Sequence, residues 1–186
     1  MLAAALTQRY PGASEGELAL RESAVAICTA HLAAGLGDAN MAGRLCSTDD
    51  HTYWQALSEV LVARELQKVG LEATHANAGP DFLIEQDGKR IWIEVICPTP
   101  AGLPPQWLVW QEGVVFSVPH EAMLLRWTAA IKEKAEKLIG PPGQPQHGYL
   151  AKGVVADGDA YVIAVNGRLL RSAFPELAGI SQFPFA

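Results

Sequence analysis

Long apolar runs, cysteine pairs and an excess of basic residues are all missing from this sequence of 186 residues. No stretch approaches the roughly 20 apolar residues that a membrane-spanning helix needs, and the N-terminus lacks the basic start and cleavage pattern of a secretory signal. The 3 cysteines are odd in number and widely scattered, which argues against a disulfide framework. We therefore expect a soluble, cytoplasmic protein with no membrane partner.

The charge balance is acidic, with 20 Asp and Glu against 14 Lys and Arg and a net charge of −6. A protein that binds DNA tightly and without specificity carries a strong positive potential, so the overall charge counts against that class. Acidic groups that bind metal ions are, however, offset by the cations they hold. A local basic strip is compatible with this composition, and the charge does not exclude a nucleic-acid partner.

The length and composition predict one folded unit. With 49% hydrophobic and 18% charged residues, the chain is long enough to bury one sizeable core, so we expect a single domain over the whole chain, 1–186. Ser14 and Glu17 stand at the spacing of a capping box and open a predicted helix over about 15–35. That helix belongs to an expected N-terminal helical extension, about 14–46, ahead of a core over about 51–166.

The core region combines helices with short strands. Helices are expected over about 51–69 and 120–138, and each of them is followed by a glycine. The turn sequence Gln86-Asp87-Gly88-Lys89 predicts a hairpin between two strands, and the last apolar run has the composition of a buried central strand. The expected strands are 71–76, 81–85, 90–96, 107–110, 114–118, 149–155 and 160–165.

Two carboxylates stand on the two strands of the predicted hairpin. Asp81 opens one strand and Glu94 lies near the end of the other, so that both can meet at one edge of a bent sheet. Hard divalent cations such as Mg²⁺ bind oxygen ligands, and the backbone carbonyl of Val95 can complete the set. Glu94 lies in an otherwise apolar run, where an ionised carboxylate without a partner is costly. A cation would supply that partner; two acidic residues on a solvated face are the alternative.

Glu59 lies on the apolar face of the helix expected over 51–69. When its residues are placed at about 100° per residue, Arg64, Glu65 and Lys68 fall on the opposite, solvent-facing side. An inward acid on this helix can support a site on the sheet. It can equally be an acid at the edge of the core that a local donor satisfies, and the sequence leaves both interpretations open.

The helix expected over 120–138 carries one inward basic residue. Lys134 projects from within an apolar stripe, whereas Lys132 and Lys137 lie off that stripe. An ammonium group directed at carboxylates could orient water or neutralise charge that develops on a phosphate. A lysine whose aliphatic stem packs on the core is the alternative. The stripe consists of Met123, Leu124, Trp127, Ala130, Ile131 and Leu138.

Taken in order, these features resemble the PD-(D/E)XK nuclease superfamily over roughly residues 51 to 166. Pro80 and Asp81 match its first strand motif, Glu94 matches the acidic member of the next motif, and Glu59 matches the helix motif. The resemblance implies a restriction-endonuclease-like α/β core, with a mixed four-stranded sheet flanked by helices, to which the helix expected over 15–35 is an extra N-terminal helix. It also implies a Mg²⁺ or Mn²⁺ site and hydrolysis of nucleic-acid phosphodiester bonds.

One position departs from this pattern. The lysine expected two residues after the acid is Ile96, which can neither donate a hydrogen bond nor activate water. Either another cation has taken over, with Lys134 as the first choice, or cleavage has been lost. A non-catalytic nuclease-fold module that binds protein or nucleic acid, and a simple α/β protein without a metal, are the alternatives to an active enzyme. In the enzyme hypothesis the catalytic residues are Glu59, Asp81, Glu94 and Lys134, and Asp81, Glu94 and Val95 hold the Mg²⁺ or Mn²⁺ ion.

Overall fold

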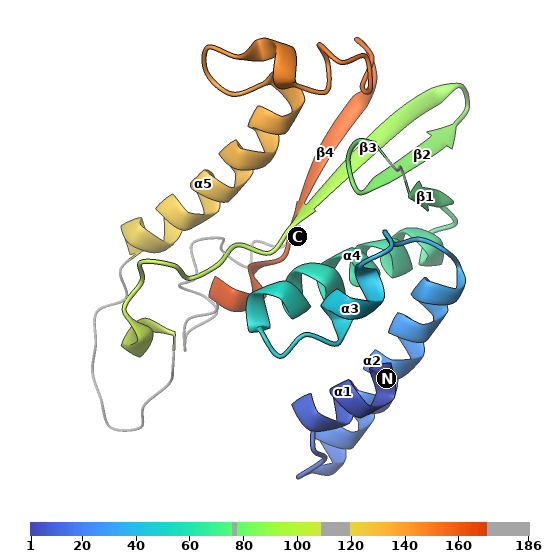
Figure 1. Ribbon diagram of the computed structural model, residues 1–186, viewed down its shortest axis with the longest axis vertical. Helices are drawn as coiled ribbons and strands as arrows, with labels where there is room; N and C mark the ends of the chain where they lie inside the picture. Colours follow the sequence, from blue (N-terminus) through green and yellow to red (C-terminus); the bar gives the residue numbers. More distant parts are fainter. Residues whose placement is uncertain (76–77, 109–119, 171–186) are drawn as a thin grey trace, which may run out of the picture.

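The computed structural model describes residues 1–75, 78–108 and 120–170, which form an α/β fold with a mixed four-stranded sheet flanked by helices (Figure 1). This architecture confirms the expected class. The helices are α1 (Leu2–Arg9), α2 (Glu15–Ala33), α3 (Met41–Leu45), α4 (Asp50–Lys68) and α5 (His120–Ile139). The strands are β1 (Ala73–His75), β2 (Phe82–Gln86), β3 (Lys89–Ile96) and β4 (Ala160–Val165), with short 3-10 turns at Pro105–Trp107, Pro145–His147 and Gly167–Leu170.

The strands lie in the order β1-β2-β3-β4, with β1, β2 and β3 antiparallel and β4 parallel to β3. The β2–β3 hairpin turns at Asp87 and Gly88, whose φ angles of 52° and 73° suit a type I′ turn. Because Asp-Gly favours that turn, the chain reverses where the sequence predicted. β4 runs parallel to β3 because α5 lies in the connection and returns the chain along the sheet.

The helices α4 and α5 cover opposite faces of the sheet (Figure 1). On one face, Ile93 and Val95 of β3 pack in a buried cluster with Ala63 of α4. On the other face, the hydroxyl of Tyr161 in β4 donates a hydrogen bond to the backbone carbonyl of Lys134 in α5, at 3.1 Å. Side chains that alternate along β3 therefore point at two different helices.

The three predicted helices are confirmed as α2, α4 and α5, and α1 and α3 are additional. Ser14 caps α2 by accepting a hydrogen bond from the backbone N–H of Glu17, and the Glu17 carboxylate accepts one in return from the N–H of Gly12. None of the helices in the described ranges combines the length and apolar character needed to cross a membrane. The helices α1 to α4 share a buried cluster made of Leu6, Ala24, Cys28, Met41, Leu45, Tyr53, Ala56, Leu57 and Val60.

The strand expected over 149–155 is wrong, because this segment forms turns. Its first backbone N–H groups bond to the end of α5: Tyr149 donates to the carbonyl of Lys137 at 2.8 Å, and Leu150 donates to that of Leu138 at 3.1 Å. The last carbonyls of a helix have no partner within the helix. The segment is thus used to satisfy the C-terminal end of α5 and does not extend the sheet.

Two further expectations concern strands. The run 160–165 is a strand, but it is the edge strand of the described sheet, and Val162 is 44% exposed, so the predicted central position is wrong. An apolar run does not by itself reveal how many neighbours a strand has. The strand expected over 107–110 begins as a 3-10 turn, Pro105–Trp107, and its end lies outside the described residues, as does the strand expected over 114–118.

The packing of Gly167 against Trp127 gives a testable consequence. A Cβ atom at Gly167 would lie 2.5 Å from Cη2 of the Trp127 ring, which is buried beside Met123. We therefore expect Gly167→Ala to lower the free energy of unfolding by about 1–3 kcal/mol, as overpacking usually does. Gly43→Ala is the matched control: Gly43 lies in α3 with nothing within 4 Å of the added atom, so alanine should be neutral or raise stability by up to about 1 kcal/mol. Urea unfolding of both variants checks this, and equal stability would contradict it.

Candidate functional site

The alternation of β3 places Glu94 on the face that α5 covers. Its neighbours Ile93 and Val95 face α4, so the Glu94 side chain points the other way. Phe82 pairs with Ile93, and continuing this register by one residue sets Asp81 opposite Glu94. The structure therefore brings both predicted carboxylates to one face at the end of the hairpin.

Asp81 is held by the backbone of the neighbouring strand. Its Oδ2 accepts a hydrogen bond of 2.7 Å from the N–H of Val95. Burial, followed by the nearby charge of Glu59, raises the pKa of Asp81 to about 6, although the bond from Val95 acts in the opposite direction. Near pH 6 the carboxyl group is therefore close to the point where it gains or loses its proton, and a cation beside it would favour the charged form.

Glu94 is 1% exposed and receives two ammonium groups on one oxygen. Lys134 donates to Glu94 Oε1 at 2.6 Å, and Lys137 donates to the same atom at 2.7 Å. Within the described part of the chain, the second oxygen, Oε2, is buried and has no hydrogen-bond partner. A buried carboxylate oxygen without a partner is costly, and a bound cation would satisfy it.

Lys134 comes from the buried side of α5, as the sequence predicted. It is 7% exposed and lies in line with Met123, Trp127 and Ala130, which are also buried. Leu124 and Ile131, which were expected in the same stripe, are 42% and 39% exposed, so the stripe is narrower than predicted.

Lys137 was expected away from the site, and the structure corrects this. It follows Lys134 by three residues, which places the two side chains as neighbours on the surface of a helix. Burial alone would lower the pKa of Lys137, but its hydrogen bond and charge interaction with Glu94 raise the pKa overall. The helical spacing was a signal for this residue, but no sequence pattern indicated that its long side chain would reach Glu94.

Ile96 points into the same space as Glu94, because it lies two residues further along β3. It is 7% exposed and lines the site pocket. The backbone on either side of it is held by Gln55 of α4: the Gln55 amide donates to the Val95 carbonyl at 3.1 Å and accepts from the Cys97 N–H at 2.8 Å. Gln55 was not predicted, although it lies one helical turn before Glu59 on the same face.

Glu59 has a protein partner of its own. Its two oxygens accept hydrogen bonds of 2.8 and 3.0 Å from Arg44 of α3, and this pairing raises the pKa of Arg44. Arg44 also reaches Asp38 at 3.1 Å. Glu59 is thus satisfied by a donor from the N-terminal helices, and its role at the site is indirect, through its charge near Asp81. Arg44 was missed because the sequence gives no indication of where α3 packs.

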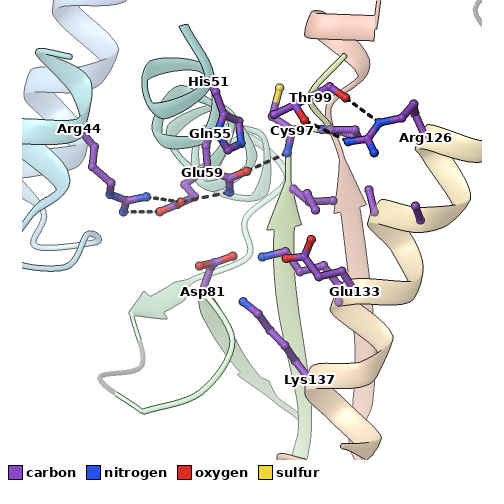
Figure 2. A pocket seen from close by; sticks show the side chains of 15 residues that line it. Arg44, His51, Gln55, Glu59, Asp81, Cys97, Thr99, Arg126, Glu133 and Lys137 are labelled. Carbon is purple, nitrogen blue, oxygen red and sulfur yellow. Dashed lines mark hydrogen bonds and ion pairs between the residues drawn. The ribbon is translucent and has the colours of Figure 1, made fainter. Parts of the chain in front are cut away.

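These residues surround a cavity of about 430 Å³ between α3, α4, the end of β3 and α5 (Figure 2). In Figure 2 the Arg44–Glu59 pair closes one side, and Arg126, which donates to the carbonyl and hydroxyl of Thr99 at 3.0 Å, closes another. Basic and acidic groups are interspersed around this space, in contrast to the acidic chain as a whole. The lining residues are Arg44, His51, Gln55, Glu59, Asp81, Ile96, Cys97, Pro98, Thr99, Arg126, Ala129, Ala130, Glu133, Lys134 and Lys137.

The candidate cation ligands are two carboxylates and a backbone carbonyl. Among residues 1–75, 78–108 and 120–170, no three His, Cys, Asp or Glu side chains are grouped so that they could hold a metal ion. Mg²⁺ usually binds through one or two carboxylates and keeps several waters, which matches the pair Asp81 and Glu94. The Val95 carbonyl already accepts a bond from Gln55, but a carbonyl has a second lone pair available for a cation.

The raised pKa of Asp81 predicts how stability depends on pH without metal ions. Its ordinary value is 3.8, so the folded state binds the proton more tightly than the unfolded state, and the stability gained this way is lost as the pH rises through about 6. Because the group is partly exposed, we expect the loss between pH 4 and pH 7 to be about 1–2 kcal/mol. Asp81→Asn should lack this loss and be the more stable protein at pH 7. Urea unfolding in the presence of a chelator checks this, and parallel pH profiles for the two proteins would contradict it.

Comparisons with known protein families, with characterised proteins and with solved structures gave no match. The function is therefore argued from the geometry of the site.

Proposed function

We propose that the protein hydrolyses phosphodiester bonds of nucleic acids, with a Mg²⁺ or Mn²⁺ ion held by Asp81, Glu94 and the Val95 carbonyl. The observation that carries the proposal is the state of Glu94. Its Oε1 is bonded by Lys134 at 2.6 Å, and its Oε2 is buried and has no partner among the described residues. Continuing the hairpin register by one residue sets Glu94 opposite Asp81. Asp81 and Lys134 line the pocket, and Glu94 is bonded to Lys134 beside it. Two carboxylates and a lysine are the groups that metal-assisted hydrolysis needs.

The order of elements supports the same proposal. The helix α4, the antiparallel strands β1 to β3, the crossover helix α5 and the parallel strand β4 follow one another as in the superfamily that the sequence resembles. A restriction-endonuclease-like core is therefore part of what we propose. In this arrangement Asp81 and Glu94 belong to the hairpin, and the basic residues come from the crossover helix.

The residues of the chain have distinct roles in this mechanism. Asp81 and Glu94 would hold the cation, which when bound would supply Lewis-acid stabilisation of the negative charge on the phosphate. Lys134 holds the Glu94 carboxylate in place through its 2.6 Å hydrogen bond and directs an ammonium group at the charge that develops on the phosphate. The Val95 N–H orients the Asp81 carboxylate, and Gln55 fixes the end of β3 from which these groups project.

Lys134 is suited to replace the lysine that is absent at position 96. Ile96 lies on the face of β3 that α5 covers, so a lysine at that position would enter the same space. Lys134 reaches this space from the helix. What differs is the element that carries the ammonium group.

A non-catalytic module that binds nucleic acid or protein is the second candidate, and the charge balance favours it. Lys134 and Lys137 both pair with Glu94, the charge of Lys134 also acts on Asp81, and Arg44 pairs with Glu59. The acidic groups therefore have basic partners without a cation. Such a module would bind through the same pocket and would not cleave.

Cleavage assays separate the two candidates. Wild-type protein, Asp81→Ala and Lys134→Ala are incubated with single- and double-stranded DNA and RNA in Mn²⁺. We expect the wild type to cleave at least one substrate and each variant to lose about 100-fold or more, because each removes a group that contacts the reacting phosphate or its cation. Lys132→Ala is the control, since Lys132 lies on the exposed side of α5, 3.6 Å from Glu136. If the wild type cleaves none of the substrates, the proposed hydrolysis is wrong and the binding module is favoured.

A swap of the lysine tests its relocation directly. Lys134→Ala should be inactive, and adding Ile96→Lys should recover at least about tenfold of the lost rate, because the new ammonium would enter the same pocket beside Glu94. Lys134→Ala with Ile96→Leu is the matched control and should stay inactive. Thermal unfolding shows whether each variant is folded. The relocation would be contradicted if the double variant Lys134→Ala, Ile96→Lys is folded but is no more active than Lys134→Ala.

A further inference from the structure

The two lysines on Glu94 differ in how freely they can move. Both donate to the same oxygen, Oε1, but the Lys134 side chain is 9% exposed and the Lys137 side chain is 42% exposed. The Lys134 side chain is buried between α5 and the sheet and is held at Glu94. Lys137 lies at the mouth of the pocket, where its side chain can rotate toward solvent or toward a bound molecule.

The electrostatics favour such an exchange. Two ammonium groups within 2.7 Å of one oxygen repel each other, so they compete for Glu94 Oε1. Lys137 is the more exposed of the two lysines, and Glu94 keeps its ion pair with Lys134 when Lys137 turns away. An anion that enters the pocket would offer Lys137 a partner that it does not share with Lys134.

The other cations around the pocket are already engaged. Arg44 is bonded by both oxygens of Glu59, and Arg126 is bonded to the carbonyl and hydroxyl of Thr99. Figure 2 shows Lys137 pointing from α5 toward the side of the pocket that carries Asp81. Among the described lining residues, Lys137 thus combines a positive charge, a shared partner and an exposed side chain beside the proposed reaction site.

We propose that Lys137 binds a backbone phosphate of the nucleic-acid substrate, and that this role is separate from that of Lys134. The inference rests on the proposed function for its substrate class. When the strand enters the pocket, the Lys137 ammonium group exchanges Glu94 for a phosphate oxygen, while Lys134 stays with Glu94. Lys137 therefore contributes to substrate affinity, and Lys134 contributes to the chemical step.

Binding without divalent cations tests the phosphate contact apart from cleavage. Fluorescence anisotropy follows a labelled single-stranded DNA of about 15 nucleotides between about 50 and 200 mM KCl. Lys137→Ala, which lacks one phosphate contact, should bind the DNA more weakly than the wild type. Its slope of log K against log salt should be smaller in magnitude by about 0.7. Lys137→Arg should retain the wild-type slope. Lys132→Ala, on the exposed side of the same helix, is the matched control and should leave affinity and slope unchanged.

Steady-state cleavage distinguishes a phosphate contact from a purely structural role. If Lys137 contacts substrate, Lys137→Ala should raise KM about five- to tenfold, change kcat by less than about twofold and leave the Mn²⁺ dependence unchanged. If Lys137 only neutralises Glu94, the Mn²⁺ midpoint and kcat should shift while the salt slope stays constant, and the inference would be overturned.

The two proposals fail in different ways. If the wild type cleaves no substrate but Lys137→Ala still reduces the salt slope, the phosphate contact stands and the hydrolysis does not. If the wild type does not bind the oligonucleotide, or if the slope is the same in wild type and Lys137→Ala, the assignment of Lys137 is wrong whatever the cleavage assay gives.

Discussion

The burial of the Glu94 charge is the constraint on which the rest of the site depends. A carboxylate that is 1% exposed has lost its hydration and must be compensated by the protein, at a cost of several kcal/mol per ion if it is not. The compensation comes from α5, through Lys134 and Lys137. It ties the helix to β3 at the point where the hairpin ends, and the Tyr161 hydroxyl adds a second tie to the backbone of the same helix. The packing of α5 is thus inseparable from the state of Glu94.

The same site places several like charges close together. Glu59 and Glu94 both raise the pKa of Asp81, and burial has the larger effect. Arg44 offsets Glu59 from outside the sheet, so the N-terminal helices contribute to the electrostatics of the pocket. Groups whose pKa is displaced by burial and neighbouring charges are concentrated at functional sites, and they also occur in structural ion-pair networks. This argument favours a functional role for Asp81 over a solvated surface acid.

The parts of the site that follow from local chemistry could be predicted from the sequence. The Asp87-Gly88 turn fixes the register of the hairpin, and that register sets Asp81 opposite Glu94. Arg44, Gln55 and Lys137 could not be predicted, because their roles depend on how α3, α4 and α5 dock against the sheet. The central position predicted for the strand over 160–165 and the strand predicted over 149–155 were wrong for a similar reason. An apolar run indicates burial and does not indicate which neighbour provides it.

Position 96 of β3 is isoleucine, so the cation beside Glu94 comes from another element. A lysine on β3 would move with Glu94 on one rigid strand, so their separation would be fixed by the pleat. Lys134 instead reaches Glu94 from a different element, and their 2.6 Å contact holds only while α5 is docked. The docking of α5 depends in part on contacts at its C-terminal end, where the backbone of Tyr149 and Leu150 satisfies its last carbonyls. In this protein the geometry of the candidate site is therefore a tertiary property, and changes near the end of α5 can disturb it without touching Asp81 or Glu94.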